Sequence, residues 1–416
     1  MAESPEDHPV VVIGAGAAGI LAALFAQRGG RSVVLLERTA DGGRKILISG
    51  GGRCNILPSR EEPERFVTGS SRHTLRRILR SWPLAEQRGF LERELGMRLV
   101  LEPESGKLFP QSQRARDVRD RLLARVRDAG ARVRFGAMVT GLLPPAAPTG
   151  RWVVEFAGAP ALEASAVVVA TGGLSVPATG SDGTGLAIAR ALGHDVQAPY
   201  PALTPLVADP PVHAHLAGVS LDVTLRAPGA RPRFATAGGF LFTHRGYSGP
   251  TVLDASHLAI RSRANGRSPQ PLTVQWTSWD RAAWESALIA GRGHVGTLVA
   301  RQMPSRLAAQ LLIEAGVPGD RPAARLDRDS RRRLVSLLAE YPIPWTGDEG
   351  FKKAEVTGGG VSLAEIDPRT MESRRHPGLF LSGEMLDAFG PIGGHNFQWA
   401  WATGRAAGMA VSARPR

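Results

Sequence analysis

The chain has 416 residues, with 43% hydrophobic and 21% charged side chains, which leaves room for two or three domains and excludes a wholly disordered protein. Its formal net charge is +13, and only four of its 51 basic residues are lysines, so arginine carries the charge. The single cysteine, Cys54, excludes an intrachain disulfide and with it a disulfide-stabilised scaffold. The charge fits either a polyanionic partner or an arginine-rich solvated surface.

An almost continuously apolar run at residues 10–26 needs a separate explanation. Glu3, Glu6 and Asp7 precede the run and three glycines interrupt it, which is untypical of a secretory signal peptide. The run is also slightly short for a membrane span. We therefore expect a soluble, cytoplasmic protein with no membrane partner.

The run itself predicts a strand, a glycine turn and a helix. Residues 10–13 are β-branched and suit a strand buried on both faces, and a helical pattern covers residues 20–28. Between them, Gly14 allows a tight turn, Gly16 lets a pyrophosphate approach the backbone, and Gly19 lets the helix pack closely. The free N–H groups at the helix N-terminus attract phosphate. A fortuitous glycine turn is the alternative.

A second apolar strand at residues 32–36 ends at Glu37. Its carboxylate lies close to the spacing expected of the residue that accepts hydrogen bonds from ribose hydroxyls. An acid here disfavours a 2′-phosphate, so FAD or NAD fits this site better than NADP.

A second glycine block distinguishes FAD from NAD. It covers residues 41–45 and 49–55, where glycines let backbone approach a flat ligand closely. Arg44, Lys45 and Arg53 would place cations beside a pyrophosphate or flavin. A plain NAD-binding unit would continue into its next helix instead.

Arginine is concentrated between residues 65 and 134. This segment has 17 basic and 8 acidic side chains, a local excess of +9. The arginine fork suits phosphate, although a solvated face with intrahelical ion pairs is the alternative. The candidates for nucleic-acid contact are Arg72, Arg76, Arg80, Arg114, Arg121 and Arg125.

Two later segments repeat the strand-then-turn pattern. Residues 166–170 form a buried strand before Thr171 and Gly172, and residues 379–381 precede Gly383 and Glu384. A further turn at 390–396 opens a helix that continues to about residue 409. An FAD domain built from both chain ends needs this order, with the adenine half early and the flavin half late. Glu384 would then hold ribitol hydroxyls, and the helix beginning near Gly394 would face the flavin.

The middle of the chain predicts a different architecture. Short strands from 204 to 259 indicate a small barrel or antiparallel sheet, and a strand at 272–276 precedes helical patterns at 281–289, 296–302, 306–315 and 330–340. The expected boundaries are 1–195 with 350–416 for the FAD domain, 196–278 with 341–349 for the β domain, and 279–340 for a helical subdomain.

Several of these segments together resemble one flavoprotein family across essentially the whole chain. They are GRK at 43–45, SGGGRCN at 49–55, YPALTPL at 200–206, LFTH at 241–244 with SGP at 248–250, VTGGGV at 356–361, and GG at 393–394 with NFQ at 396–398. The family includes aminoacetone-oxidase-like and bile-acid C=C-reductase-like NAD(P)/FAD-dependent oxidoreductases, and some members reduce a uridine of 23S ribosomal RNA to dihydrouridine.

The resemblance implies a glutathione-reductase-like, Rossmann-type FAD domain of the α/β class, with an inserted β-barrel-like domain and a helical subdomain. The sequence departs from the family near the flavin, where relatives often carry tyrosine in place of His395 and Ser-Ser-Gly in place of Ala402-Thr403-Gly404.

Three side chains are candidates for catalysis. His244 lies in a dense polar turn, where it would line the site and donate a hydrogen bond or proton, or be a structural histidine. Cys54 would supply a proton beside the flavin, or fill a gap as a small buried residue. His395 would contact flavin or substrate from the last glycine turn.

The expected function is FAD-dependent hydride transfer to an activated C=C, with a uridine of 23S rRNA as the preferred substrate. The alternatives are a small-molecule flavoenzyme acting on an aminoketone or steroid-like enone, and an RNA-binding assembly factor with a structural flavin. NADH or NADPH is the expected electron donor, although the turn at 180–185 is too loose to be its fingerprint. No metal site is expected.

The residues expected to bind FAD are Gly14, Gly16, Ala17, Ala18, Gly19, Glu37, Arg38, Gly43, Arg44, Lys45, Ser49, Gly51, Gly52, Cys54, Asn55, Thr171, Gly172, Gly383, Glu384, Gly393, Gly394, Asn396 and Phe397.

Overall fold

The computed structural model describes residues 8–147, 150–264 and 268–414, and the chain divides into two compact units. Unit 1 comprises Met1–Tyr200 and Val356–Arg416, and unit 2 comprises Pro201–Glu355. Unit 1 is therefore assembled from both ends of the chain.

The centre of unit 1 is a parallel five-stranded sheet. Its strand order is β20 (Leu379–Leu381), β10 (Ala166–Val169), β1 (Val10–Ile13), β2 (Val33–Leu36) and β6 (Arg132–Arg134). Every residue of β1, β2, β10 and β20 is buried, as expected of strands covered on both faces. The strands predicted from residues 10–13, 32–36, 166–170 and 379–381 are thus neighbours in one sheet.

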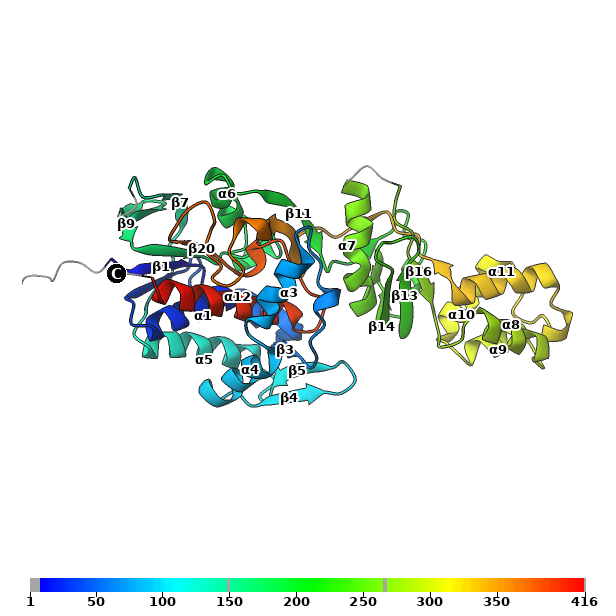
Figure 1. Ribbon diagram of the computed structural model, residues 1–416. Helices are drawn as coiled ribbons and strands as arrows, with labels where there is room; N and C mark the ends of the chain where they lie inside the picture. The colour runs from blue at the N-terminus through cyan, green and yellow to red at the C-terminus, as the bar shows by residue number, and fades with distance from the viewer. Residues whose placement is uncertain (1–7, 148–149, 265–267, 415–416) are drawn as a thin grey trace, which may run out of the picture. The chain divides into compact units, whose positions relative to one another are not determined.

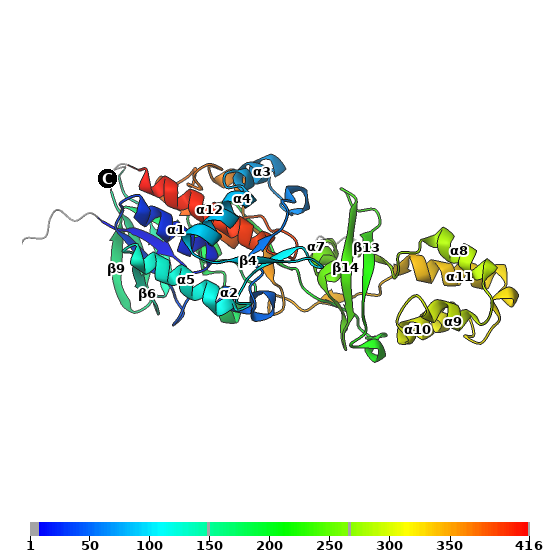
Figure 2. The ribbon, with the colours of Figure 1, turned by 90° about the horizontal axis from the view of Figure 1, so that it is seen from below.

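Three long helices pack in this unit, with α1 (Ala17–Arg28) between α12 (His395–Ser412) and α5 (Ala115–Asp128) in both views (Figure 1, Figure 2). Two glycines let α12 approach α1 closely. A Cβ on Gly404 would lie 2.3 Å from Ala18 O, and one on Gly408 would lie 2.5 Å from Ala22 O. Because α1 is covered by α12, α5 and the sheet, it is apolar nearly all round.

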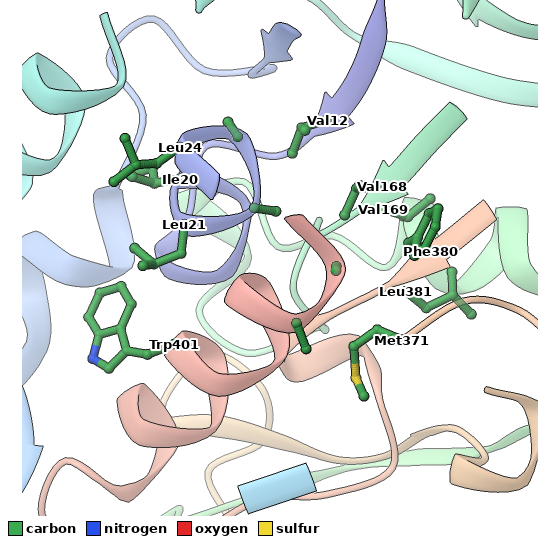
Figure 3. Close-up of a cluster of buried hydrophobic side chains, with 14 of the residues drawn as sticks. Val12, Ile20, Leu21, Leu24, Val168, Val169, Met371, Phe380, Leu381 and Trp401 are labelled. Carbon is green, nitrogen blue, oxygen red and sulfur yellow. The ribbon is translucent and has the colours of Figure 1, made fainter. Parts of the chain in front are cut away.

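The core of unit 1 joins the two chain ends. Ile20 and Leu21 of α1 lie among side chains of the sheet and of α12, including Phe380 and Trp401 (Figure 3). Figure 3 also shows Met371 in this cluster. Early and late segments therefore share one hydrophobic core.

Smaller elements complete unit 1. Two antiparallel sheets have the orders β7 (Val139–Leu143), β8 (Trp152–Phe156), β9 (Ala159–Ala164) and β3 (Leu57–Pro58), β5 (Lys107–Pro110), β4 (Leu99–Glu102). Its other helices are α2 (Arg44–Ile48), α3 (Arg72–Arg80), α4 (Leu84–Gly89) and α6 (Thr184–Ala191). The strands β11 (Val196–Ala202) and β19 (Val356–Val361), where the chain leaves and re-enters the unit, pair with each other.

Unit 2 contains a seven-stranded sheet. Its order is β17 (Tyr341–Pro342), β16 (Thr273–Gln275), β13 (Ser220–Ala227), β14 (Phe234–Phe242), β15 (Gly246–Ser248), β12 (Leu206–Val207) and β18 (Gly347–Asp348). In the described part of the chain, the outer strands β17 and β18 do not pair, so the expected barrel-like domain is an open antiparallel sheet.

Helix α7 (Pro250–Ala264) packs on this sheet, against β13 and β14. The other four helices of unit 2 are α8 (Arg281–Ala290), α9 (Val295–Ala300), α10 (Ser305–Ala315) and α11 (Arg328–Ala339). They lie close to the four predicted helical ranges and pack against one another.

Among the described residues, no helix combines the length and apolarity that crossing a bilayer requires.

Candidate functional site

Four of the predicted cofactor-binding loops meet at one edge of the five-stranded sheet. They follow β1, β2, β10 and β20, whose carboxyl ends are adjacent because the strands are parallel neighbours. The N–H of Gly14 donates to Leu36 O at 2.7 Å, and the N–H of Ser382 donates to Val169 O at 3.0 Å. This edge is where open α/β sheets bind their ligands.

The three fingerprint glycines occupy three different environments. A Cβ on Gly14 (φ +102°) would lie 2.5 Å from Ala170 O, and one on Gly19 would lie 1.9 Å from Gly14 O. A Cβ on Gly16 would meet nothing within 4 Å. Gly14 and Gly19 are therefore needed for packing, whereas the space beside Gly16 is open to a ligand.

Gly16 is also the N-cap of α1, and no side chain caps this helix end. The first N–H groups of a helix have no carbonyl partner within it, which here applies to those of Ala17, Ala18 and Gly19. A helix N-terminus of this kind fits a pyrophosphate.

The Glu37 carboxylate is buried and already oriented. Oε2 accepts a hydrogen bond from Ala15 N at 2.9 Å, and Oε1 accepts from Thr39 N at 2.8 Å and from Thr39 Oγ1 at 2.7 Å. These bonds fix Glu37 beside the first glycine turn and leave acceptor capacity on its oxygens. The next residue, Arg38, forms an ion pair with Asp182.

The second glycine block contains a short helix, α2. Gly43 (φ +61°) caps α2, and its N–H donates to Ala15 O at 2.9 Å. Arg44 begins the helix and pairs with Asp41 at 2.6 Å. A turn at Ser49–Gly52 follows, in which Gly50 (φ +56°) and Gly51 (φ +66°) have left-handed backbone. The block therefore packs on the first glycine turn through the backbone contact between Gly43 and Ala15. Its helix, α2, is shorter than a regular second Rossmann helix.

A network of polar side chains lies where the flavin end is expected. Lys45 Nζ donates to Glu384 Oε2 and, at 2.6 Å, to Ser175 Oγ. Glu384 Oε1 accepts from Ser175 Oγ at 2.6 Å and from Thr357 N at 3.0 Å. The network connects α2, the loops after β10 and β20, and β19, so it assembles segments from both chain ends. The roles predicted for Lys45 and Glu384 in binding remain predictions.

Helix α12 holds the loop that carries Glu384. Thr403 Oγ1 accepts a hydrogen bond from Gly383 N at 3.0 Å, and Trp399 Nε1 donates to Gly383 O at 3.0 Å. Gly383 has φ +79°, and a Cβ there would lie 2.8 Å from Ala18 Cβ. Although Thr403 departs from the family pattern, it therefore retains a hydroxyl that orients the acid-bearing loop.

The turn before α12 is closed by its own side chains. Asn396 accepts from Gly390 N at 2.9 Å and donates to Gly390 O at 3.0 Å, so its amide braces the turn. Gly393 and Gly394 have positive φ, and a Cβ on Gly394 would lie 2.4 Å from the Leu57 carbonyl carbon. Phe397 stacks on Trp401 with ring centroids 5.4 Å apart.

Within the described residues, several buried polar atoms in these segments have no hydrogen-bond partner. They are Thr171 Oγ1, Ser382 Oγ, His395 Nδ1 and Gln398 Oε1. Buried polar groups without a partner are uncommon and call for an explanation such as a bound ligand. Together with the open space at Gly16, these atoms fit a dinucleotide with an adenine end and a polar ring end. Gly172, which follows Thr171, has φ +76° and packs on Ser181.

Cys54 is fully buried, in a left-handed backbone conformation with φ +62°. Burial raises the pKa of its thiol to about 12, and the hydrogen bond from Ser49 only partly offsets this. The thiol therefore stays protonated over the physiological range, which favours the structural alternative for Cys54. Of its neighbours, Gly51 and Gly52 are exposed, whereas Asn55 is half-buried.

The two histidine candidates lie in different units. His395 is buried in unit 1, with its ring edge-on to Phe66 and its Nε2 atom 3.4 Å from Glu62 Oε2. The hydrogen bond with His395 is the main reason that the pKa of Glu62 falls to about 2. His244 lies in unit 2, on an exposed turn between β14 and β15, and its role stays a prediction.

Three of the predicted arginines lie in α3, and the other three lie in α5 or, for Arg114, at its N-cap. On α3, Arg76 and Arg80 are exposed, whereas Arg72 donates to Glu64 O at 3.2 Å. Arg114 approaches Asp117 at 4.0 Å, Arg121 donates to Leu95 O and Gly96 O, and Arg125 is half-buried.

Sequence reasoning missed the partners that organise the flavin end. Ser175 lies in none of the quoted motifs, and Thr357 lies in the VTGGGV segment without having been assigned a role; their bonds to Glu384 span 209 and 27 residues. Asp387 was also missed. Its buried carboxylate accepts from Gly69 N at 2.9 Å and from Ser70 Oγ at 2.8 Å. An acid three residues after Glu384 was the only available signal.

Curated relatives match this chain over nearly its full length. It is 31% identical over 412 residues to a 3-dehydro-bile acid delta(4,6)-reductase of Clostridium scindens, covering 97% of this chain and 99% of that one. It is 30% identical over 407 residues to a ribosomal RNA dihydrouridine synthase of Haemophilus influenzae, covering 97% and 98%.

Solved structures share the fold at low identity. A 3-ketosteroid-delta4-(5alpha)-dehydrogenase from Rhodococcus jostii aligns with a TM-score of 0.53 and 16% identity, over 99% of this chain and 98% of that one. A 3-ketosteroid delta1-dehydrogenase from Sterolibacterium denitrificans aligns with a TM-score of 0.53 and 14% identity, over 98% and 99%.

The model of the family described as HI0933-like protein Rossmann domain matches residues 8–410. The match spans both halves of unit 1 and all of unit 2, and it agrees with the Rossmann-type topology of the parallel sheet. The expected fold class and enzyme class are confirmed at this level. The chain belongs to the HI0933-like Rossmann family and is an FAD-dependent oxidoreductase.

Proposed function

We propose that this enzyme transfers a hydride to an activated C=C, and that its substrate is a uridine of 23S ribosomal RNA. Curated relatives act on a bile acid or on ribosomal RNA and are almost equally similar to this chain, so identity favours neither. The arginines of α3 favour RNA. Arg76 and Arg80 are exposed and have no carboxylate partner among the described residues.

Residues from both chain ends would hold the cofactor. The open space at Gly16 and the uncapped N-terminus of α1 suit the pyrophosphate, and Glu37 suits the adenosine ribose. At the other end, Lys45 and Glu384 would border the ribitol and the ring. Bound FAD, when reduced, would supply the hydride. NADH or NADPH would deliver the electrons to it.

Reduction of a C=C also requires a proton. We assign its delivery to His395, whose Nδ1 atom is buried and has no partner among the described residues, while Nε2 faces Glu62. The Glu62 carboxylate would orient the ring through its contact with Nε2. Cys54 is the weaker candidate because its buried thiol holds its proton up to about pH 12.

A direct assay tests the substrate. FAD-loaded protein is incubated anaerobically with NADH or NADPH and either unmodified 23S rRNA or a 3-keto-4-ene steroid, and the products are analysed by mass spectrometry. Dihydrouridine in the RNA supports the proposal. Reduction of the enone alone would overturn the RNA substrate and favour the small-molecule alternative, which the bile-acid relative supports. Bound FAD without turnover on either substrate would favour a structural flavin.

A further inference from the structure

A positively charged groove in unit 1 lies between α3 and the loop that contains Pro368 and Arg369. Its volume is about 570 Å³. The groove is lined by His73, Arg76, Arg77, Arg80, Ser81, Pro368 and Arg369. Arg77 and Arg369 were not among the predicted nucleic-acid residues, and Arg72, which was, does not line the groove.

The charge of this groove is not neutralised by the protein. Among the described residues, the side chains of Arg76, Arg77, Arg80 and Arg369 form no ion pair or hydrogen bond, and all four residues are exposed. Arg77 and Arg80 lie in the last turn of α3, where the helix dipole favours cations. That preference does not explain Arg76, or Arg369 on the opposite wall. Four like charges in one groove repel one another unless an anion joins them.

Both walls are fixed to the loop that follows Glu384. Helix α3 buries Leu75, Ile78 and Leu79, and the residues just before it are bound by the Asp387 carboxylate through Gly69 and Ser70. Ser70 Oγ also accepts from Leu363 N at 3.0 Å, which ties in the chain leading to Arg369.

The Arg369 loop is braced locally as well. Its own N–H donates to Asp367 Oδ1 at 2.8 Å, and Pro368 is buried. The groove is therefore a preorganised surface. One of its supports, Asp387, belongs to the flavin-end loop and lies three residues after Glu384, the acid predicted to bind the cofactor.

The lining defines the ligand chemistry. Guanidinium groups bind phosphate oxygens in pairs, and several of them along an open groove suit a chain of phosphates better than a single anion. His73 is the only aromatic ring in the lining, so base stacking contributes little. We propose that this groove binds the phosphodiester backbone of RNA. The choice of RNA as the ligand rests on the proposed function. The preference for phosphate rests on the arginines that line the groove.

Binding by this groove would be largely independent of sequence and strongly dependent on salt. Each phosphate contact that is lost lowers the slope of log K against log salt by about 0.7 to 0.9. The Arg76→Gln/Arg369→Gln variant removes one cation from each wall, so the magnitude of its slope on single-stranded RNA should fall by about 1.4.

The test measures the binding of the FAD-loaded full chain to a fluorescent single-stranded RNA by anisotropy, at several salt concentrations. The matched control, Arg116→Gln/Arg132→Gln, removes two exposed arginines that lie outside the groove. The groove variant should bind RNA about tenfold more weakly at low salt and with a lower slope, whereas the control should change little. Unchanged flavin absorbance checks that the variants are folded.

Equal losses in the groove variant and the control would overturn the proposal, because net charge would then explain the binding. Unchanged RNA binding with weaker binding of NADPH or inorganic phosphate would also overturn it, and would make the groove a small-phosphate site. Groove-dependent RNA binding without dihydrouridine formation would contradict the proposed function alone. Dihydrouridine formation with groove-independent binding would contradict this inference alone.

Discussion

The two ends of the proposed cofactor site are built in different ways. At the adenine end, backbone groups would bind the cofactor, because Gly16 leaves open space and the N-terminus of α1 is uncapped. At the flavin end, side chains from four distant segments form the network around Glu384. The first end is a local device that one stretch of chain can form, and the second exists only after both halves of unit 1 have joined.

The largest effect is expected at the adenine end. Gly16 has an ordinary φ of −85° and free space around it, so Gly16→Val should fold normally. Its side chain would occupy the pyrophosphate position and displace charge-assisted hydrogen bonds worth about 3 kcal/mol or more, which weakens FAD binding about 100-fold. Flavin absorbance after dialysis measures the loss, and circular dichroism verifies the fold. Full retention of FAD would place the pyrophosphate elsewhere.

Gly19→Ala provides the contrast at the same end. Its Cβ would lie 1.9 Å from Gly14 O, so the helix must move away from the turn. We expect a loss of thermal stability in the cofactor-free protein, which Gly16→Val should not show. Equal melting temperatures for the two variants would contradict the division of roles between these glycines.

At the flavin end, a double-mutant cycle tests the network. Glu384→Gln and Lys45→Met each leave a half-buried partner unsatisfied and should each cost about 1–3 kcal/mol in the free energy of unfolding. The double variant should cost less than the sum, with a coupling of about 1 kcal/mol. Urea unfolding measures all four proteins. Simple additivity would mean that the pair adds nothing to the joining of the chain halves.

The Glu62–His395 contact predicts a pH dependence. The pKa of Glu62 is lowered from 4.5 to about 2 in the folded protein, mainly by His395, so this carboxylate stabilises the fold above its unfolded pKa. The stabilisation is lost as the pH falls from 4.5 toward 2. His395→Gln should therefore be less stable than the wild type near neutrality, and the difference should shrink in acid. Urea midpoints at pH 6 and pH 3 measure it, and a constant difference would contradict this account.

The smallest effect is expected at Cys54. A buried thiol with a pKa of about 12 is a poor proton donor, so Cys54→Ala should keep turnover within about threefold, whereas losing a general acid would cost 100-fold or more. Steady-state assays on whichever substrate is active measure this. A loss of 100-fold with normal FAD content would restore Cys54 as the donor. Resistance of the folded thiol to alkylation at pH 8 is a parallel check.

The same contrast explains how far the sequence predicted the structure. The strands at 10–13 and 166–170, the helix after Gly16 and the position of Glu37 follow from local periodicity and spacing, and the structure places them in one sheet edge. Other contacts join segments that only the tertiary fold brings together. Examples are the hydrogen bond from Thr357 to Glu384 and the position of Arg369 opposite α3. No local pattern encodes such contacts.

The unit 2 sheet illustrates another kind of difference. Alternation and turn residues predicted its strands, but whether a sheet closes depends on twist and on the pairing of its outer strands. In the described part of the chain, β17 and β18 are both edges. Likewise, the arginines of α3 could be located from the sequence. That they have no carboxylate partner among the described residues depends on the surrounding loops, which only the structure shows.

The position of β20 in the sheet has a consequence for biosynthesis. Strand β10 pairs with β1 on one side and with β20 on the other, and β20 begins only at Leu379. Until the ribosome has made that segment, an entirely apolar strand has an unpaired edge, which is a known risk for aggregation. Helix α12 follows β20 in the chain, so the nascent chain cannot form the proposed cofactor site until both segments have been made. We therefore expect FAD to bind only after these late segments have joined the sheet.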